Sequence, residues 1–161
     1  MSTAQTKVSV DFMTKADMPM VLGIENQFEF PWSEDEFIKV LRQRNHIGMV
    51  AVIDGRVVGF LIYALHTKRI HLVNFAVHRD CFRQGIGKAM LSRLLRKLGT
   101  GETDRNRVLL EVRETNIDAQ LFFRAFGFRA ISILENYYDC SNEDAYLMQY
   151  RCPTDTEVQR A

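Results

Sequence analysis

The glycine-containing turn at residues 83–88 constrains the fold more than any other feature of the sequence. Before it, residues 71–77 have the apolar pattern of a strand, and from Gly85 onward the apolar residues recur at helical spacing. Glycines let a backbone approach a ligand closely, and the unpaired amides and the dipole of a helix N-terminus bind anions. The segment therefore predicts either a phosphate site or only a tight strand-to-helix turn.

Two better-known glycine motifs do not fit this turn. A Walker loop requires Gly-x-x-x-x-Gly-Lys-Ser/Thr, whereas Gly87-Lys88 is followed by Ala89, and position 82 is a phenylalanine. A dinucleotide fingerprint requires a third glycine at the position that Met90 occupies. We therefore expect neither of these nucleotide sites.

Local signals divide the rest of the chain into strands and helices. Asp54-Gly55 predicts a hairpin, Ser33 and Glu36 predict a helix start with a capping box, and Gly99 is the expected C-cap of the central helix. Strands are predicted at residues 8–13, 49–53, 56–65, 71–77, 108–112, 128–134 and 146–150, helices after Thr14, Ser33, Gly85 and Asn116, and a loop at 135–144. This order predicts a mixed α/β single domain with a partly parallel sheet.

Composition and charge exclude several classes of protein. The 161 residues suffice for one domain, and 47% hydrophobic and 25% charged residues are typical of a globular chain rather than a disordered one. Lys and Arg number 21 against 20 Asp and Glu, so the net charge of +1 argues against a protein that binds duplex nucleic acid. A small basic pocket for a phosphate-bearing ligand remains compatible with this balance.

Cysteine usage and hydropathy indicate a cytosolic protein. The chain has three cysteines, Cys81, Cys140 and Cys152, an odd number without the spacing of a zinc site. We therefore expect reduced thiols and no metal. The first residues lack the apolar core of a signal peptide, and the longest apolar stretch, residues 57–65, is shorter than the roughly 20 residues that span a bilayer. We expect a cytoplasmic location and no membrane or nucleic-acid partner; the oligomeric state stays open.

Residues 75–91 resemble the acetyl-coenzyme A binding motif of the GNAT acetyltransferase superfamily, whose pattern is Gln/Arg-x-x-Gly-x-Gly/Ala. Four further blocks are similar to the ribosomal-protein-alanine N-acetyltransferase (RimI) family: residues 30–34, 110–116, 126–128, and 136–138 with 143–145. The blocks keep the family's order and spacing, and the resemblance covers about residues 8–150.

The resemblance implies the GNAT fold. This is an α/β single domain with a mixed central β-sheet of about six to seven strands, flanked by four helices. It would occupy residues 8–151, with a flexible N-terminus at residues 1–7 and a polar C-terminal tail at residues 152–161.

The resemblance also implies that acetyl-CoA is the acetyl donor. The residues that it marks for coenzyme contact are Phe75, Ala76, Val77, Arg83, Gln84, Gly85, Ile86, Gly87, Lys88, Asn116 and Phe123. Two positions depart from the family. Phe82 stands where the family has Gln or Arg, and we expect binding to survive because backbone amides hold the pyrophosphate. Phe123 stands where a RimI-like tyrosine would protonate the departing thiolate, and it has no proton to give.

Glu111 and His71 are the candidate catalytic residues. The resemblance places a general base at Glu111, at the end of the central strand; from the residues alone, Glu111 is equally a solvated carboxylate or a partner of Arg113. His71 is the second candidate, because imidazole titrates near neutral pH, although a lone histidine on a strand is more often structural.

Two aromatic segments are expected on loops that flank the acceptor groove in this family. They are Phe30, Pro31 and Trp32, and Tyr137 and Tyr138. Trp32 has an alternative as a core anchor against the first helix. Glu143 and Asp144 either attract a cationic acceptor or are solvated loop charges.

These assignments imply an acetyl-CoA-dependent N-acetyltransferase in which an amine attacks directly, with a protein N-terminal α-amine, such as that of a ribosomal protein, as the first choice. Cys81 has no evident base partner, so a covalent acyl-enzyme is not expected. One alternative is an acetyltransferase for a small amine, such as an amino sugar, a polyamine or an antibiotic. The other is a catalytically silent acyl-CoA-binding module, which Phe82 and Phe123 favour.

Overall fold

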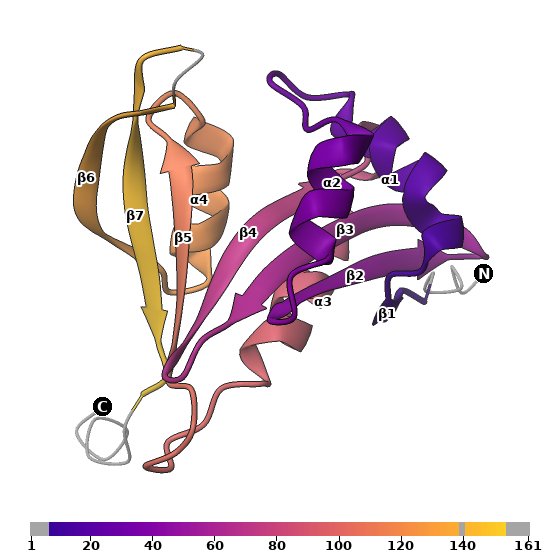
Figure 1. The fold of residues 1–161 in the computed structure, drawn as a ribbon. Coiled ribbons are helices and arrows are strands. Elements are labelled where there is room, and N and C mark those ends of the chain that lie inside the picture. The colour runs from indigo at the N-terminus through magenta and orange to yellow at the C-terminus, as the bar shows by residue number, and fades with distance from the viewer. Residues whose placement is uncertain (1–6, 139–140, 154–161) are drawn as a thin grey trace, which may run out of the picture. The chain divides into compact units, whose positions relative to one another are not determined.

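The computed structural model describes residues 7–138 and 141–153. The elements of this part of the chain are β1 (Ser9–Phe12), α1 (Met18–Glu25), α2 (Glu34–Leu41), β2 (His46–Ile53), β3 (Arg56–Leu65), β4 (Arg69–Val77), α3 (Ile86–Leu95), β5 (Arg107–Arg113), α4 (Ile117–Ala125), β6 (Arg129–Tyr138) and β7 (Glu143–Arg151) (Figure 1). Short 3₁₀ turns precede α1 at Lys15–Asp17 and α3 at Arg79–Cys81. Most of the expected flexible N-terminus and polar tail, and Cys140, lie outside the described residues. None of the described helices has the length and apolar character needed to cross a membrane.

The strands hydrogen-bond in the order β1-β2-β3-β4-β5-β7-β6. β4 and β5 run parallel, whereas β1 and β2, β2 and β3, β5 and β7, and β6 and β7 pair antiparallel. This confirms the expected α/β fold with a mixed, seven-stranded sheet and four helices. The chain forms two compact units: residues up to 65 with 74–97, and residues 66–73 with those from 98 onward. Strand β4 contributes to both units, because the division falls between Val73 and Asn74.

The first unit is built around β3, whose central residues are buried throughout. Gly59 faces α3, since a Cβ on it would lie 3.0 Å from Met90 Cε, whereas the ring of Phe60 packs 5.6 Å from that of Phe37 on α2. Successive residues of a strand point to opposite faces, so α2 and α3 cover opposite faces of this part of the sheet (Figure 1). The sheet is therefore apolar on both sides here.

The local signals of the first unit are confirmed. Ser33 Oγ accepts the N–H of Glu36, while the Glu36 carboxylate accepts the N–H of Ser33, which completes the capping box. Asp54 and Gly55 both have positive φ, at 50° and 75°, as a two-residue hairpin turn of the mirror-image type requires.

In the second unit, β5 alternates between a buried and a half-buried face. Val108, Leu110 and Val112 are buried, which leaves Glu111 and Arg113 together on the other face. Helix α4 follows, and its N-cap Asn116 accepts the N–H of Ala119 as expected. The polar side chains of Glu111 and Arg113 therefore lie on one face of β5.

Two element boundaries differ from expectation. Helix α3 ends at Leu95, and Gly99 is not its C-cap: the Gly99 N–H donates to the carbonyl of Arg105 in the following loop. Strands β6 and β7 extend through most of the predicted loop, because Tyr138 pairs with Glu143 beyond an irregularity that begins at Leu134. Tyr137 and Tyr138 thus lie on a strand rather than on a loop.

Candidate functional site

The candidate coenzyme turn in the first unit presents a run of unpaired amides. Gly85 is the N-cap of α3 with φ at 78°, and Arg83 also has a positive φ, at 64°. Within the described chain, no acceptor receives the backbone N–H groups of residues 83–88. Buried Ile86 anchors the start of this ten-residue helix, whereas Lys88 is exposed. The turn can therefore bind an anion such as a pyrophosphate through its backbone and the helix dipole.

The strand end before this turn is organised by a buried carboxylate that the sequence analysis missed. Asn74 Nδ2 donates to Glu25 Oε2 over 2.6 Å, and Asn74 Oδ1 accepts the N–H of Phe75 over 2.8 Å. The N–H of Phe75 is thus engaged by a side chain; of the expected coenzyme segment, Phe75 and Val77 are half-buried and Ala76 is buried.

Burial raises the pKa of Glu25, the hydrogen bond from Asn74 acts to lower it, and Glu36 adds a smaller upward push. Only 8% of Glu25 is exposed. An acidic residue on the apolar side of α1, directly after Ile24, was the available sequence signal.

Phe82 has its own packing partner in the first unit. Its ring stacks on that of Phe28, with the centroids 6.4 Å apart. Next to this pair, Gln27 Oε1 accepts the N–H of Arg79, and Gln27 Nε2 lies 3.1 Å from His78 Nε2. The aromatic ring at the family's Gln/Arg position therefore links the segment after α1 to the coenzyme turn.

The first aromatic acceptor segment is partly structural. Phe30 is exposed with φ at 60°, and Pro31 is exposed beside it. Trp32 is half-buried and packs edge-on against Phe37, with ring centroids 5.2 Å apart. Trp32 therefore anchors to α2 through this ring contact.

The second unit brings the two candidate bases together. His71 Nε2 lies 2.6 Å from Glu111 Oε2, and the side chains are 31% and 19% exposed. In the neutral tautomer that donates from Nε2 to the carboxylate, Nδ1 keeps a lone pair, and it has no hydrogen-bond partner among the described residues. The pair can thus receive one proton at Nδ1 of His71.

The two remaining coenzyme candidates of the second unit have structural contacts. Asn116 uses its carbonyl oxygen as the helix cap, which leaves its amide Nδ2 for a ligand. Phe123 is buried, and its ring packs edge-on against Phe122 and Phe128 at 5.2 and 5.4 Å. A phenyl ring in this place has no ionisable proton.

Tyr137 and Tyr138 lie within the electrostatic influence of Glu111. Burial raises the pKa of Tyr137, and the Glu111 carboxylate adds to that effect. Burial likewise raises the pKa of Tyr138 to about 12, against the lowering effect of Arg113, with Glu111 again acting upward. The two rings contact each other edge-on at 4.9 Å, and Tyr137 is 46% exposed.

The acidic pair beside these tyrosines is already engaged. Glu143 forms an ion pair with Arg113 over 2.7 Å, and Asp144 Oδ1 accepts the N–H of Asn136. Glu143 is therefore not a freely solvated loop charge. Glu111 is bonded to His71, and Arg113 is bonded to Glu143. Sequence reasoning missed the second pair because Glu143 lies 30 residues beyond Arg113.

Comparison with known proteins adds independent findings. Residues 18–128 match the Acetyltransferase (GNAT) family. The chain is 32% identical over 138 residues to an uncharacterized N-acetyltransferase of Methanocaldococcus jannaschii, covering 85% of this chain and 87% of that protein. It is 31% identical over 146 residues to the [ribosomal protein bS18]-alanine N-acetyltransferase of Escherichia coli K12, covering 87% and 95%. The crystal structure of the ribosomal-protein-S18-alanine N-acetyltransferase from Escherichia coli superposes with a TM-score of 0.79 at 28% identity, covering 90% and 94%.

Proposed function

Because the chain belongs to the GNAT acetyltransferase family, we propose that it transfers the acetyl group of acetyl-CoA to the N-terminal α-amine of a protein. The similarity to ribosomal protein bS18-alanine N-acetyltransferases supports this acceptor class and makes a ribosomal protein a candidate. The observation that carries the proposal is the 2.6 Å hydrogen bond between His71 and Glu111. A cytosolic location belongs to the same proposal.

The residues of the coenzyme turn fit a pyrophosphate. The amides of residues 83–88 are without protein acceptors in the described chain, and Gly85 allows a ligand to approach, since nothing lies within 4 Å of the place of its missing Cβ. We assign the pyrophosphate to these amides, with Lys88 nearby as a cation. Residues 75–77 and Asn116 are further proposed contacts. Acetyl-CoA supplies the activated thioester carbonyl.

The His71–Glu111 pair would remove the proton of the attacking amine. Glu111 holds the Nε2–H of His71, which orients the ring and stabilises the imidazolium that forms when Nδ1 accepts a proton. Alternatively, Glu111 accepts the proton through its other oxygen. In both cases the proton remains on the pair, so Glu111 and His71 act as one unit rather than as rival bases.

An α-amine acceptor demands less of a general base than a lysine does. Its reference pKa is about 7.7–8.0, so roughly a tenth is already neutral at pH 7, whereas a lysine with a pKa of about 10.4 is neutral less than one time in a thousand. The leaving thiolate, with a reference pKa near 8.5, can depart without a tyrosine acid at Phe123. We propose direct transfer without an acyl-enzyme.

The aromatic residues would bind the acceptor. Tyr137 is exposed, and both tyrosines carry their hydroxyl proton near neutral pH, as a phenol ordinarily does, so both can donate hydrogen bonds to a peptide backbone. Phe30 and Pro31 are exposed and can contact the first side chain of the peptide, while Trp32 anchors their segment to α2.

The test is a product map. The protein is incubated with labelled acetyl-CoA and a mixture of peptides with free N-termini, and in parallel with amino sugars and polyamines, and the products are located by mass spectrometry. We expect label on peptide α-amines. Label on small amines alone would establish the small-molecule alternative, and coenzyme binding without any product would establish the silent module.

A further inference from the structure

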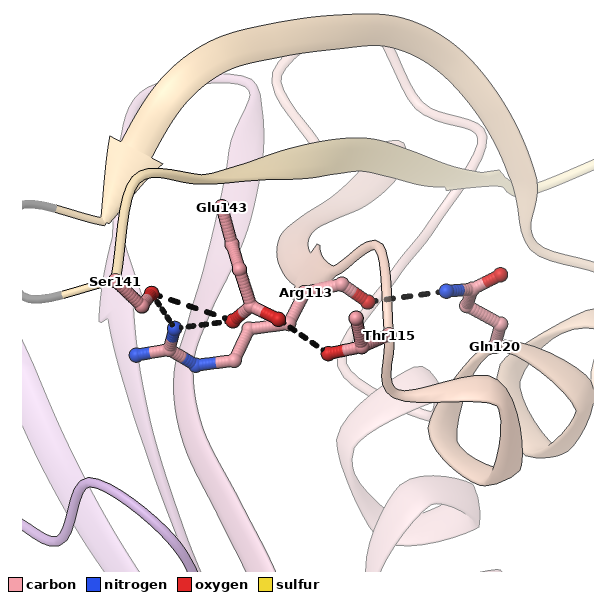
Figure 2. Close-up of polar contacts among 5 residues, drawn as sticks. All are labelled: Arg113, Thr115, Gln120, Ser141 and Glu143. Atoms are coloured by element: carbon pink, nitrogen blue, oxygen red, sulfur yellow. Dashed lines mark hydrogen bonds and ion pairs between the residues drawn. The ribbon is translucent and has the colours of Figure 1, made fainter.

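Arg113, the last residue of β5, connects three segments of the second unit. Its Nη1 donates to Ser141 Oγ and to Glu143 Oε2, each over 2.7 Å (Figure 2). Its carbonyl oxygen accepts a hydrogen bond of 3.0 Å from Gln120 Nε2 on α4. The backbone of Arg113 is therefore hydrogen-bonded to α4, and its side chain is hydrogen-bonded to residues at the start of β7.

The carboxylate that receives Arg113 is itself held. Glu143 Oε1 accepts the hydroxyl of Thr115, and Ser141 Oγ lies 3.3 Å from Glu143 Oε2 (Figure 2). Hydrogen bonds from Thr115 and Arg113 lower the pKa of Glu143. The carboxylate thus stays ionised, and the positive charge of Arg113 is compensated two residues away from Glu111 on the same face of β5.

The guanidinium also covers an aromatic ring. Its Cζ lies 3.7 Å from the centroid of the Tyr138 ring, at the end of β6, and the ring of Tyr137 contacts Tyr138 edge-on. A planar guanidinium can stack on a ring and bind a carboxylate at the same time, whereas a lysine ammonium is a compact point charge. Arginine therefore suits this double contact better than lysine does.

We propose that Arg113 is a positioning residue for acceptor binding, which holds Tyr138, and through it Tyr137, at the end of β6. This inference rests on the proposed function, because that function assigns the two tyrosines to the acceptor. We assign Arg113 no direct contact with the amine or the coenzyme. Its loss should therefore weaken binding of the acceptor and leave binding of acetyl-CoA intact.

The experiment compares steady-state kinetics of the whole protein and its Arg113→Lys variant with an acceptor peptide taken from the product map. We expect the KM for the peptide to rise by up to roughly tenfold, the scale of a lost desolvated cation–π contact, while the KM for acetyl-CoA stays unchanged; the urea midpoint should fall slightly, because the lost contact lies within the fold. Arg151→Lys, an exposed arginine on β7, is the matched control and should leave both constants unchanged. An unchanged peptide KM in Arg113→Lys would overturn the inference.

A second variant isolates the ring contact. In a Tyr138→Leu background the substitution Arg113→Lys should have little further effect on the peptide KM, because the ring through which Arg113 acts is gone. Equal effects in both backgrounds would overturn the inference. If the unsubstituted protein acetylates no peptide, the proposed function is wrong. If it acetylates peptides and Arg113→Lys has the same peptide KM, only the positioning role of Arg113 is wrong.

Discussion

At the scale of single residues, Glu111 and Glu25 show that the hydrogen-bond partner of a carboxylate determines its chemical role. Glu111 is bonded to an imidazole that can change its charge, which suits proton transfer. Glu25 is buried and bonded to the neutral amide of Asn74, which offers no charge compensation. Burial therefore raises the pKa of Glu25, and its ionised form destabilises the fold. Glu25 would hold the backbone at Phe75 through Asn74.

The variant Glu25→Gln tests this account. A carboxyl whose pKa is raised in the folded state holds its proton there while the unfolded chain releases it, so stability falls as pH rises above about 4.5 until the folded pKa is passed. Glutamine does not titrate. Urea unfolding at pH 4 and pH 7.5 should show Glu25→Gln gaining stability relative to the unsubstituted protein at the higher pH. The same difference at both pH values would contradict the assignment.

At the scale of elements, the N-terminus of α3 combines an unusual backbone conformation with the proposed coenzyme site. Gly85 has φ at 78°, and nothing would obstruct a Cβ there. The only cost of alanine at this position would be the strain of its left-handed backbone conformation, about 1 kcal/mol. We expect Gly85→Ala to lower the free energy of unfolding by about that amount and to weaken acetyl-CoA binding, as measured by calorimetry, since relief of the strain moves the amides.

Gly23→Ala on α1 is the matched control. Gly23 also has open space for a Cβ, but its backbone is helical, so alanine should leave stability unchanged or raise it by up to about 1 kcal/mol. Acetyl-CoA binding should not change. Equal coenzyme affinity in the two variants would show that the backbone at Gly85 does not form the pyrophosphate site.

The elements that were predictable carry their signals locally. Each of these signals involves residues at most three positions apart in the chain. They are the capping box of Ser33 and Glu36, the turn at Asp54-Gly55 and the helix cap at Asn116. The strand reaching Tyr138 was missed because its pairing with Glu143 lies beyond an irregular stretch that breaks the alternating pattern.

At the scale of the whole molecule, the expected GNAT fold and N-acetyltransferase class are confirmed by the match over residues 18–128 and by the relatives. The proposed roles divide between the two units: the first holds residues 75–77 and 83–88, and the second holds the catalytic pair and both tyrosines. Strand β4 carries residues of both sets, with His71 four positions before Phe75.

Contacts between distant segments could not be read from the sequence. Glu25 meets Asn74 across 49 residues, His71 meets Glu111 across 40, and Arg113 meets Glu143 across 30. The motif match proposed Glu111, and the chemistry of imidazole proposed His71, as separate candidates, whereas the fold joins them by a hydrogen bond. Buried polar groups need partners, so such pairs appear only once the packing is known.

The central claim, that the His71–Glu111 pair removes the amine proton, is tested most directly by Glu111→Gln. At pH 7 we expect kcat with an acceptor peptide to fall about 100-fold, the lower range of general-base catalysis, and acetyl-CoA affinity to stay unchanged. The deficit should shrink at pH 9, where the α-amine is already neutral. Glu114→Gln, an exposed carboxylate beside the site, is the control and should behave like the unsubstituted protein. A kcat that is unchanged in Glu111→Gln at pH 7 would contradict the account.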